Sequence, residues 1–255
     1  KGGRVRHYPS DQFAKDSLFR LAVAYQGSED IVNAERLFKQ FIREFPEDKN
    51  VAASYLSLAD LVMSRLDPEE LPTFEQISEA RKNYALVRES TKDIGLLSDS
   101  TFNEGGVLES AAENPDGLIN HCFEFDKNKD DVLSQGEFSS IGLEGAKSFS
   151  EYDLNGDKSM DFSEIADMAV MYSYSELESL YREYNEKYAS TEGARISEAT
   201  QKIGFACEKQ GRPSEMLNMY FEDIRKYGND PMKVGVDGIL IKYSQKYLEY
   251  ETLYG

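Results

Sequence analysis

Two twelve-residue segments constrain this chain more than any other feature, because each places oxygen-bearing side chains at alternating positions. They are 126–137 (DKNKDDVLSQGE) and 153–164 (DLNGDKSMDFSE), and both carry oxygen side chains at loop positions 1, 3, 5, 9 and 12. A hard divalent cation takes roughly six to eight oxygen ligands, and a loop around it ends in a glutamate that binds through both oxygens. Both segments meet this requirement, which predicts two Ca²⁺ sites. The alternative is a pair of acidic surface turns that bind no metal.

The spacing assigns a role to each candidate ligand. In the first loop these are the carboxylates of Asp126, Asp130 and Glu137, the amide of Asn128, the Val132 carbonyl, and Ser134 as the holder of a bound water. In the second loop they are Asp153, Asn155, Asp157, Asp161 and Glu164, with the Ser159 carbonyl at position 7.

The residues on either side of the loops extend the pattern. Apolar residues at helical spacing precede and follow each loop: Cys122 and Phe125, Phe138 and Ile141, Phe149 and Tyr152, Ile165 and Met168. Position 8 is apolar in both loops, Leu133 and Met160. Together with the ligand spacing, this set resembles a pair of EF-hands. The resemblance implies that each loop lies between two helices and that the position-8 residues form short paired strands.

Loop position 6 departs from the EF-hand pattern in both loops. The family places glycine there because the backbone has positive φ, whereas this chain has Asp131 and Lys158. A residue with a Cβ loses about 1–2 kcal/mol in that conformation, and aspartate tolerates it better than lysine. We therefore expect weak binding at both sites, with more backbone strain in the second loop. Ligand charge acts in the opposite direction, because the second loop has four carboxylate ligands and the first has three. The sequence therefore does not rank the affinities of the two sites. Weak sites suit a calcium-rich setting, and we expect a periplasmic or secreted location over the cytoplasm.

Composition narrows the class of partner. The 255 residues carry a net charge of −18 and no cluster of lysine and arginine, which argues against nucleic acid. The sequence contains no run of about 18 apolar residues, so no membrane span is predicted. Because the sequence opens on Lys1, we expect a trimmed or processed chain. Cys122 falls on the apolar side of a predicted helix, which favours a buried free thiol over a disulfide with Cys207.

The sequence before the loops predicts helix pairs. Between residues 15 and 46, two amphipathic segments end at Pro46; their apolar positions are Leu18, Leu21, Ala22 and Tyr25, then Ala34, Phe38 and Phe41. This spacing resembles a tetratricopeptide repeat, a pair of antiparallel helices. A second pair follows, with Tyr55, Leu58, Ala59 and Val62, then Ala80, Tyr84 and Val87. An insert at 66–72 separates its two helices, and Thr73 to Gln76 predicts a capping box.

The overall prediction is an all-α fold in which tetratricopeptide-like helix pairs flank a paired EF-hand module. We expect N-terminal repeats at 1–92, a linker at 93–116, the EF-hand pair at 117–172 and C-terminal repeats at 173–255. The linker is predicted from Gly95, Gly105, Gly106, Asn114 and Pro115. The C-terminal repeats are predicted from a helix at 175–188, from the apolar positions Ile203, Gly204, Cys207, Met216 and Tyr220, and from a last helix near 236–250.

These features predict a calcium-binding scaffold whose helical repeats bind a partner protein or peptide. A sensor whose partner affinity depends on Ca²⁺ is an alternative, and so is a carboxylate-based enzyme or glycan-binding module. Catalysis has little support, because the sequence has no Gly-x-Ser-x-Gly, no phosphate-binding glycine loop and no His-Glu-x-x-His. It has two histidines, His7 and His121, and we expect His121 to be packed or solvated. Tyrosines such as Tyr184, Tyr188 and Tyr247 are expected to pack between helices, with a ligand-facing role as the alternative.

Overall fold

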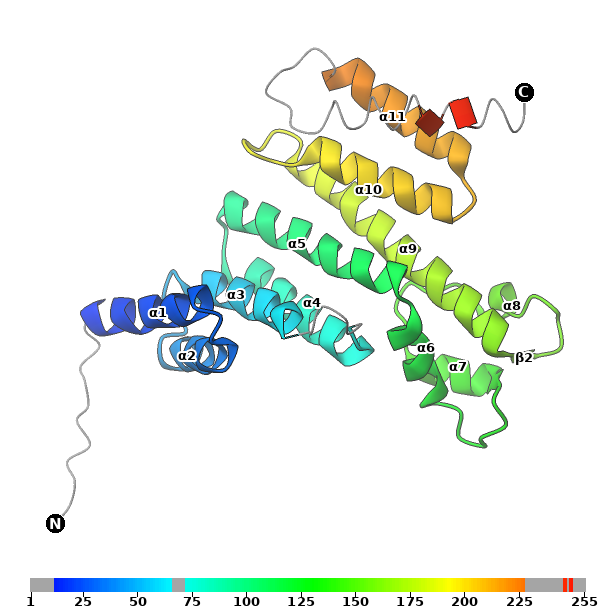
Figure 1. The fold of residues 1–255 in the computed structure, drawn as a ribbon, viewed down its shortest axis with the longest axis horizontal. Helices are drawn as coiled ribbons and strands as arrows, with labels where there is room; N and C mark the ends of the chain where they lie inside the picture. Colours follow the sequence, from blue (N-terminus) through cyan, green and yellow to red (C-terminus); the bar gives the residue numbers. More distant parts are fainter. Residues whose placement is uncertain (1–11, 66–71, 228–244, 247, 250–255) are drawn as a thin grey trace. The chain divides into compact units, whose positions relative to one another are not determined.

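The computed structural model describes residues 12–65, 72–227, 245–246 and 248–249. Within these ranges the chain forms eleven helices and one two-stranded sheet (Figure 1). The predicted all-α class is therefore confirmed. Most of the predicted last helix near 236–250, including Tyr247, lies outside the described residues.

The helices are α1 Gln12–Gly27, α2 Ile31–Glu44, α3 Val51–Ser64, α4 Phe74–Ser90, α5 Ile94–Glu113, α6 Asp116–Phe123, α7 Gln135–Ile141, α8 Phe149–Tyr152, α9 Phe162–Tyr188, α10 Ile196–Lys209 and α11 Pro213–Tyr227. The strands are β1 Leu133–Ser134 and β2 Ser159–Met160.

The chain divides into two compact units. The first comprises residues 1–70 and 78–100, and the second comprises residues 71–77 and 101–255. Helices α4 and α5 each contribute residues to both units. Both predicted calcium loops belong to the second unit.

The first unit is built on α1, α2 and α3, which pack in succession around an apolar cluster. Ala22, Ala34 and Phe38 are fully buried there, as the helix-pair spacing predicts. Leu21 is the exception, because 47 % of its surface is exposed. Leu18, Ala22 and Tyr25 follow the helical period toward the cluster, whereas Leu21 lies at the edge of that stripe and Phe19 packs in its place.

The second predicted helix pair corresponds to α3 and α4. The predicted core positions Leu58, Ala59, Val62, Ala80, Tyr84 and Val87 are all buried. The Tyr84 hydroxyl donates a hydrogen bond of 2.8 Å to Asp60 on α3, so this tyrosine is both packed and satisfied. At the start of α4, the N–H of Thr73 donates to Gln76 and the N–H of Gln76 donates to the Thr73 hydroxyl, which confirms the predicted capping box.

The segment 93–116, predicted as a linker, is mostly helical. Helix α5 occupies Ile94–Glu113, so the linker expectation was wrong for the backbone of this segment. The reason is visible at Gly105, where a Cβ would lie 2.3 Å from Cζ of Tyr181. Glycine is present there because the tyrosine ring from α9 packs directly on the helix backbone, although glycine inside a helix is unfavourable by itself.

In the second unit, α10 packs on both α9 and α11, and the three helices lie side by side (Figure 1). A similar contact joins α10 and α11, because a Cβ at Gly204 would lie 2.3 Å from Tyr220. Tyr184 and Tyr188 are 1 % and 2 % exposed. The alternative in which these two tyrosines face a ligand is therefore wrong, and they pack between helices as expected.

None of the described helices combines the length and the apolar character needed to cross a membrane. Both cysteines are buried and free, as predicted for Cys122. Burial raises the pKa of the Cys122 thiol to about 12, so this side chain is an uncharged core residue.

Candidate metal centre

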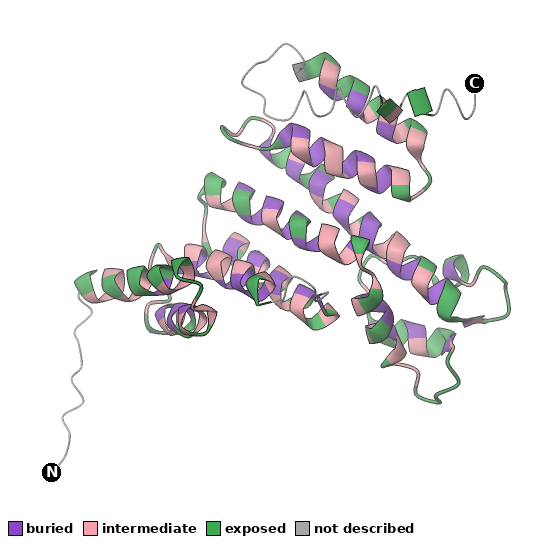
Figure 2. Ribbon diagram, viewed as in Figure 1, coloured by how far each residue is buried: buried purple, intermediate pink, exposed green. Residues whose placement is uncertain are grey.

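The two acidic loops lie between pairs of helices in the second unit. The first loop, 126–137, follows α6 and contains β1 and the start of α7. The second loop, 153–164, follows α8 and contains β2 and the start of α9. In Figure 2 their outer segments are exposed, whereas the neighbouring helices carry buried faces.

The position-1 carboxylates hold the first half of each loop in the same way. Asp126 accepts the N–H groups of Lys129 at 2.7 Å and Asp131 at 3.0 Å. Asp153 accepts those of Gly156 at 2.8 Å and Lys158 at 3.0 Å. In both loops these donors are positions 4 and 6, so each position-1 side chain is turned into its own loop.

Positions 3 and 5 repeat this correspondence. Oδ1 of Asn128 accepts the N–H of Asp130 at 3.2 Å, and Asp130 accepts that of Val132 at 3.3 Å. In the second loop, Asn155 accepts the N–H of Asp157 at 2.8 Å, and Asp157 accepts that of Ser159 at 2.9 Å.

The position-12 glutamates close each loop onto its beginning. Glu137 accepts the N–H of Lys127 and the N–H of Ser134, both at 3.0 Å. Glu164 accepts the N–H groups of Leu154 at 2.8 Å, Asn155 at 3.0 Å and Asp161 at 3.1 Å. Position 9 is the N-cap of the following helix in both loops, and each position-9 residue forms a capping box with its glutamate. The water-holding role predicted for Ser134 and the carbonyl ligands predicted at Val132 and Ser159 stay predictions.

The backbone at position 6 has the left-handed conformation that the sequence leads us to expect. Asp131 has φ of 63° and Lys158 has φ of 73°. Position 4 is left-handed too, with φ of 59° at Lys129 and 75° at Gly156. The left-handed backbone at position 4 was not predicted, although Gly156 is a sequence signal for it.

The two loops are joined through their position-8 residues. β1 and β2 pair antiparallel with Leu133 opposite Met160 and Ser134 opposite Ser159. Leu133 and Met160 are both fully buried, in a cluster with Cys122, Phe138, Ile141, Phe149, Tyr152, Ile165 and Met168. All the apolar flanking residues singled out in the sequence belong to this cluster or pack against it, Phe125 being partly buried.

The hydrogen bonds favour ionised carboxylates. The hydroxyl and N–H of Ser134 lower the pKa of Glu137, and the hydroxyl and N–H of Ser159 lower the pKa of Asp157. An ionised carboxylate offers about four acceptor sites, and Asp126 uses two of them on loop N–H groups. The remaining capacity, on several oxygens held within one loop, fits a hard cation.

A second group of potential metal ligands was not predicted from the sequence. Glu75, His121 and Glu124 place one carboxylate oxygen or ring nitrogen each within 4.8 Å of one another. Glu75 is distant in sequence from the other two, so no local motif could have indicated this group.

No protein-family model matches the chain, and neither does any curated protein.

Proposed function

We propose that this protein binds two Ca²⁺ ions through EF-hand-like loops, which stabilise a helical scaffold with tetratricopeptide-like helix pairs. The observation that carries the proposal is the equivalence of the two loops. Positions 1, 3, 5 and 12 accept backbone N–H groups from corresponding loop positions in both. Two unrelated acidic turns would have no reason to share this network and to pair at position 8.

Loop charge supports a cation. The proposed ligands include three carboxylates in the first loop and four in the second, in a chain whose net charge is −18. Holding these carboxylates near one another is unfavourable without a counter-charge. Bound Ca²⁺ would remove that repulsion, so its binding energy would also stabilise the folded state.

The position of the second loop supports a structural role for the ion. Asp161, a proposed ligand, is the N-cap of α9, and this helix continues to Tyr188. Helix α9 packs on α6, α8 and α10 within the second unit. Ordering the loop would therefore fix the first turn of a helix against which much of this unit is packed.

The helical scaffold is proposed to bind a protein or peptide, in a calcium-rich extracytoplasmic setting. The successive packing of α1, α2 and α3, and of α9, α10 and α11, supports a repeat-like architecture, and such stacks commonly present a binding surface. Capture of a partner in the presence of Ca²⁺ and of a chelator separates the scaffold from a calcium-dependent sensor. Equal capture supports the scaffold.

Calorimetric titration of Ca²⁺ into chelator-stripped protein tests the ion sites directly. We expect two equivalents, with one lost in Glu137→Gln and one lost in Glu164→Gln. Glu144→Gln is the matched control, because Glu144 is an exposed glutamate in the segment between the loops. Among the described residues, its main-chain carbonyl accepts a hydrogen bond from the Tyr172 hydroxyl and its carboxylate forms none. Absence of binding by the parent chain, or unchanged binding in both loop variants, would contradict the proposal.

A further inference from the structure

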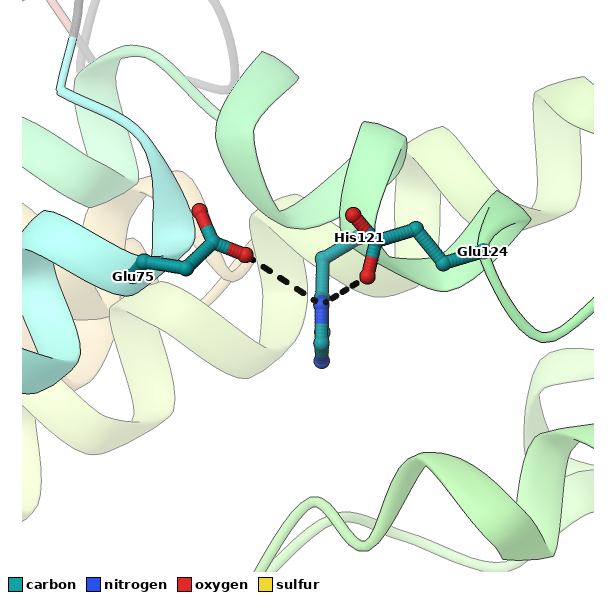
Figure 3. Close-up of side chains that lie close together, drawn as sticks. All are labelled: Glu75, His121 and Glu124. Carbon is teal, nitrogen blue, oxygen red and sulfur yellow. Dashed lines mark hydrogen bonds and ion pairs between the residues drawn. The ribbon is translucent and has the colours of Figure 1, made fainter.

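The group formed by Glu75, His121 and Glu124 lies outside both acidic loops. Nδ1 of His121 is 3.1 Å from Oε2 of Glu124 and 3.8 Å from Oε1 of Glu75 (Figure 3). Glu75 comes from the first turn of α4, His121 from the last turn of α6, and Glu124 from the C-cap of α6. Two carboxylates from two separate elements thus converge on one ring nitrogen of His121, and all three residues belong to the second unit.

The imidazole ring of His121 is held in place by aromatic neighbours. It stacks on Phe74 with a centroid distance of 4.0 Å and an interplanar angle of 12°. Phe125 contacts it edge-on, at 5.3 Å and 80°. The Phe74 ring covers one face of the imidazole, whereas a metal approaches a ring nitrogen in the plane of the ring. The contacts that orient the ring therefore leave Nδ1 accessible to a ligand between the two glutamates.

The start of α4 is fixed as well. The capping box between Thr73 and Gln76 encloses Phe74 and Glu75. Gly117 on α6 approaches the same segment so closely that a Cβ there would lie 2.8 Å from the Pro72 carbonyl oxygen. Glu75 and His121 are thus presented by two backbone segments in direct contact, which reduces the ordering cost of bringing their side chains to one ion.

We propose that Glu75, His121 and Glu124 form a site for a borderline divalent metal ion of the Zn²⁺ type. One imidazole nitrogen and two carboxylates are ligands that such ions accept, whereas Ca²⁺ takes oxygen ligands. Two ligand atoms that each lie about 2.0–2.1 Å from a tetrahedral ion are roughly 3.3–3.4 Å apart. The distances of 3.1 and 3.8 Å lie on either side of that value, and all three ligand atoms lie within 4.8 Å of one another, so rotation of the glutamate side chains would bring them toward this spacing. Water would complete the coordination.

Another group of potential ligands, Glu178, Cys207 and Glu215, shows by contrast what makes the group around His121 suitable for a metal. Its two glutamates pair with the guanidinium groups of Arg182 and Arg212. Burial raises the pKa of the Cys207 thiol to about 11, so the thiolate that a metal needs is disfavoured. Around His121, in contrast, no Lys or Arg of the described residues pairs with Glu75 or Glu124, and the site keeps its negative charge.

The experiment is a zinc titration of the calcium-saturated chain, followed by calorimetry and by NMR of the imidazole nitrogens. The chain has two histidines, so the ring signals are simple to assign. We expect one zinc equivalent and a change in the chemical shift of Nδ1 of His121. His121→Phe keeps an aromatic ring against Phe74 and Phe125 but lacks the nitrogen, and it should lose this equivalent.

Glu75→Gln and Glu124→Gln keep the histidine and serve if His121→Phe is poorly folded. Each should weaken zinc binding by at least the roughly 10- to 100-fold that loss of a supporting contact costs. His7→Gln is the control and should bind zinc as the parent does. A parent chain that binds no zinc, or zinc binding that survives all three site variants, would overturn the proposal. The outcome is separable from the calcium proposal, because the site should persist in Glu137→Gln and Glu164→Gln.

Discussion

The two acidic loops have the same oxygen spacing, but their backbones differ. In the first loop both left-handed positions carry side chains, Lys129 and Asp131. In the second loop one of the two is Gly156, and only Lys158 has a Cβ. A left-handed residue with a Cβ costs about 1–2 kcal/mol, less for aspartate. The first loop is therefore the more strained one, which reverses the expectation drawn from position 6 alone.

The second loop also has the more favourable ligands. It has four proposed carboxylate ligands against three, because position 9 is Asp161 instead of Ser134. Its closing glutamate, Glu164, is 6 % exposed and accepts three backbone N–H groups. A metal-free loop can relax its backbone strain, whereas a loop that binds the ion must keep it. The strain therefore weakens Ca²⁺ binding. Strain and charge now act in the same direction, and we expect the second loop to bind Ca²⁺ more tightly.

The largest effect is expected where the two loops meet. Met160→Ala removes a fully buried side chain opposite Leu133 and should lower the free energy of unfolding by about 2–5 kcal/mol. It should also weaken Ca²⁺ binding at both loops, which calorimetry can follow. Leu154→Ala is the control within the second loop, because Leu154 is 68 % exposed and its loss should be nearly neutral. Weakening confined to the second loop would show that the strand pair does not couple the sites.

Removal of the position-12 carboxylate from one loop at a time distinguishes the affinities of the two sites. Glu164→Gln should cost the tighter site about 3 kcal/mol, a factor of roughly 150 in affinity, because a charged ligand with strong hydrogen bonds is lost. Titration of this variant should leave the weaker isotherm, whereas Glu137→Gln should leave the tighter one. The opposite assignment would refute the proposed order of affinities.

The backbone difference can be removed by one substitution. Lys129→Gly gives position 4 of the first loop the residue found at position 156 and should strengthen that site by about 1 kcal/mol, roughly fivefold. Lys127→Gly is the control, because it removes the same charge two residues earlier, at a position where φ is not positive. Comparison of the two variants separates the effect of backbone strain on affinity from the effect of charge. Equal gains in both variants would assign the effect to charge and remove strain as the cause.

The smallest effect is expected at position 9. Ser134→Asp adds a fourth carboxylate to the first loop and keeps an N-cap residue, as Asp161 does in the second. We expect a gain of about 0.5–1 kcal/mol, which is roughly two- to fivefold in affinity, measured by calcium titration. Combined with Lys129→Gly, it should bring the two affinities together. A first site that stays unchanged would mean that position 9 serves only as a helix cap.

Local patterns were reliable wherever neighbours in sequence decide the structure. The helix-pair positions apart from Leu21, the capping box at Thr73, and the apolar residues around the loops agree with the structure, because each depends on helical spacing or on contacts within a few residues. Gly105 was misread as part of a linker. Its role depends on Tyr181, whose ring reaches it from far along the chain, and no local rule contains that contact.

The sequence by itself determined the helical class, the oxygen spacing of the two loops and the apolar stripes beside them. These follow from the period of the helix and from the positions of oxygen-bearing side chains along the chain. Only the tertiary structure decided that position 4 of the first loop is left-handed at Lys129, that Glu75 meets His121, and that the Tyr181 ring packs on Gly105. Backbone torsions and long-range contacts follow from how distant segments pack together, and packing is a property of the whole fold.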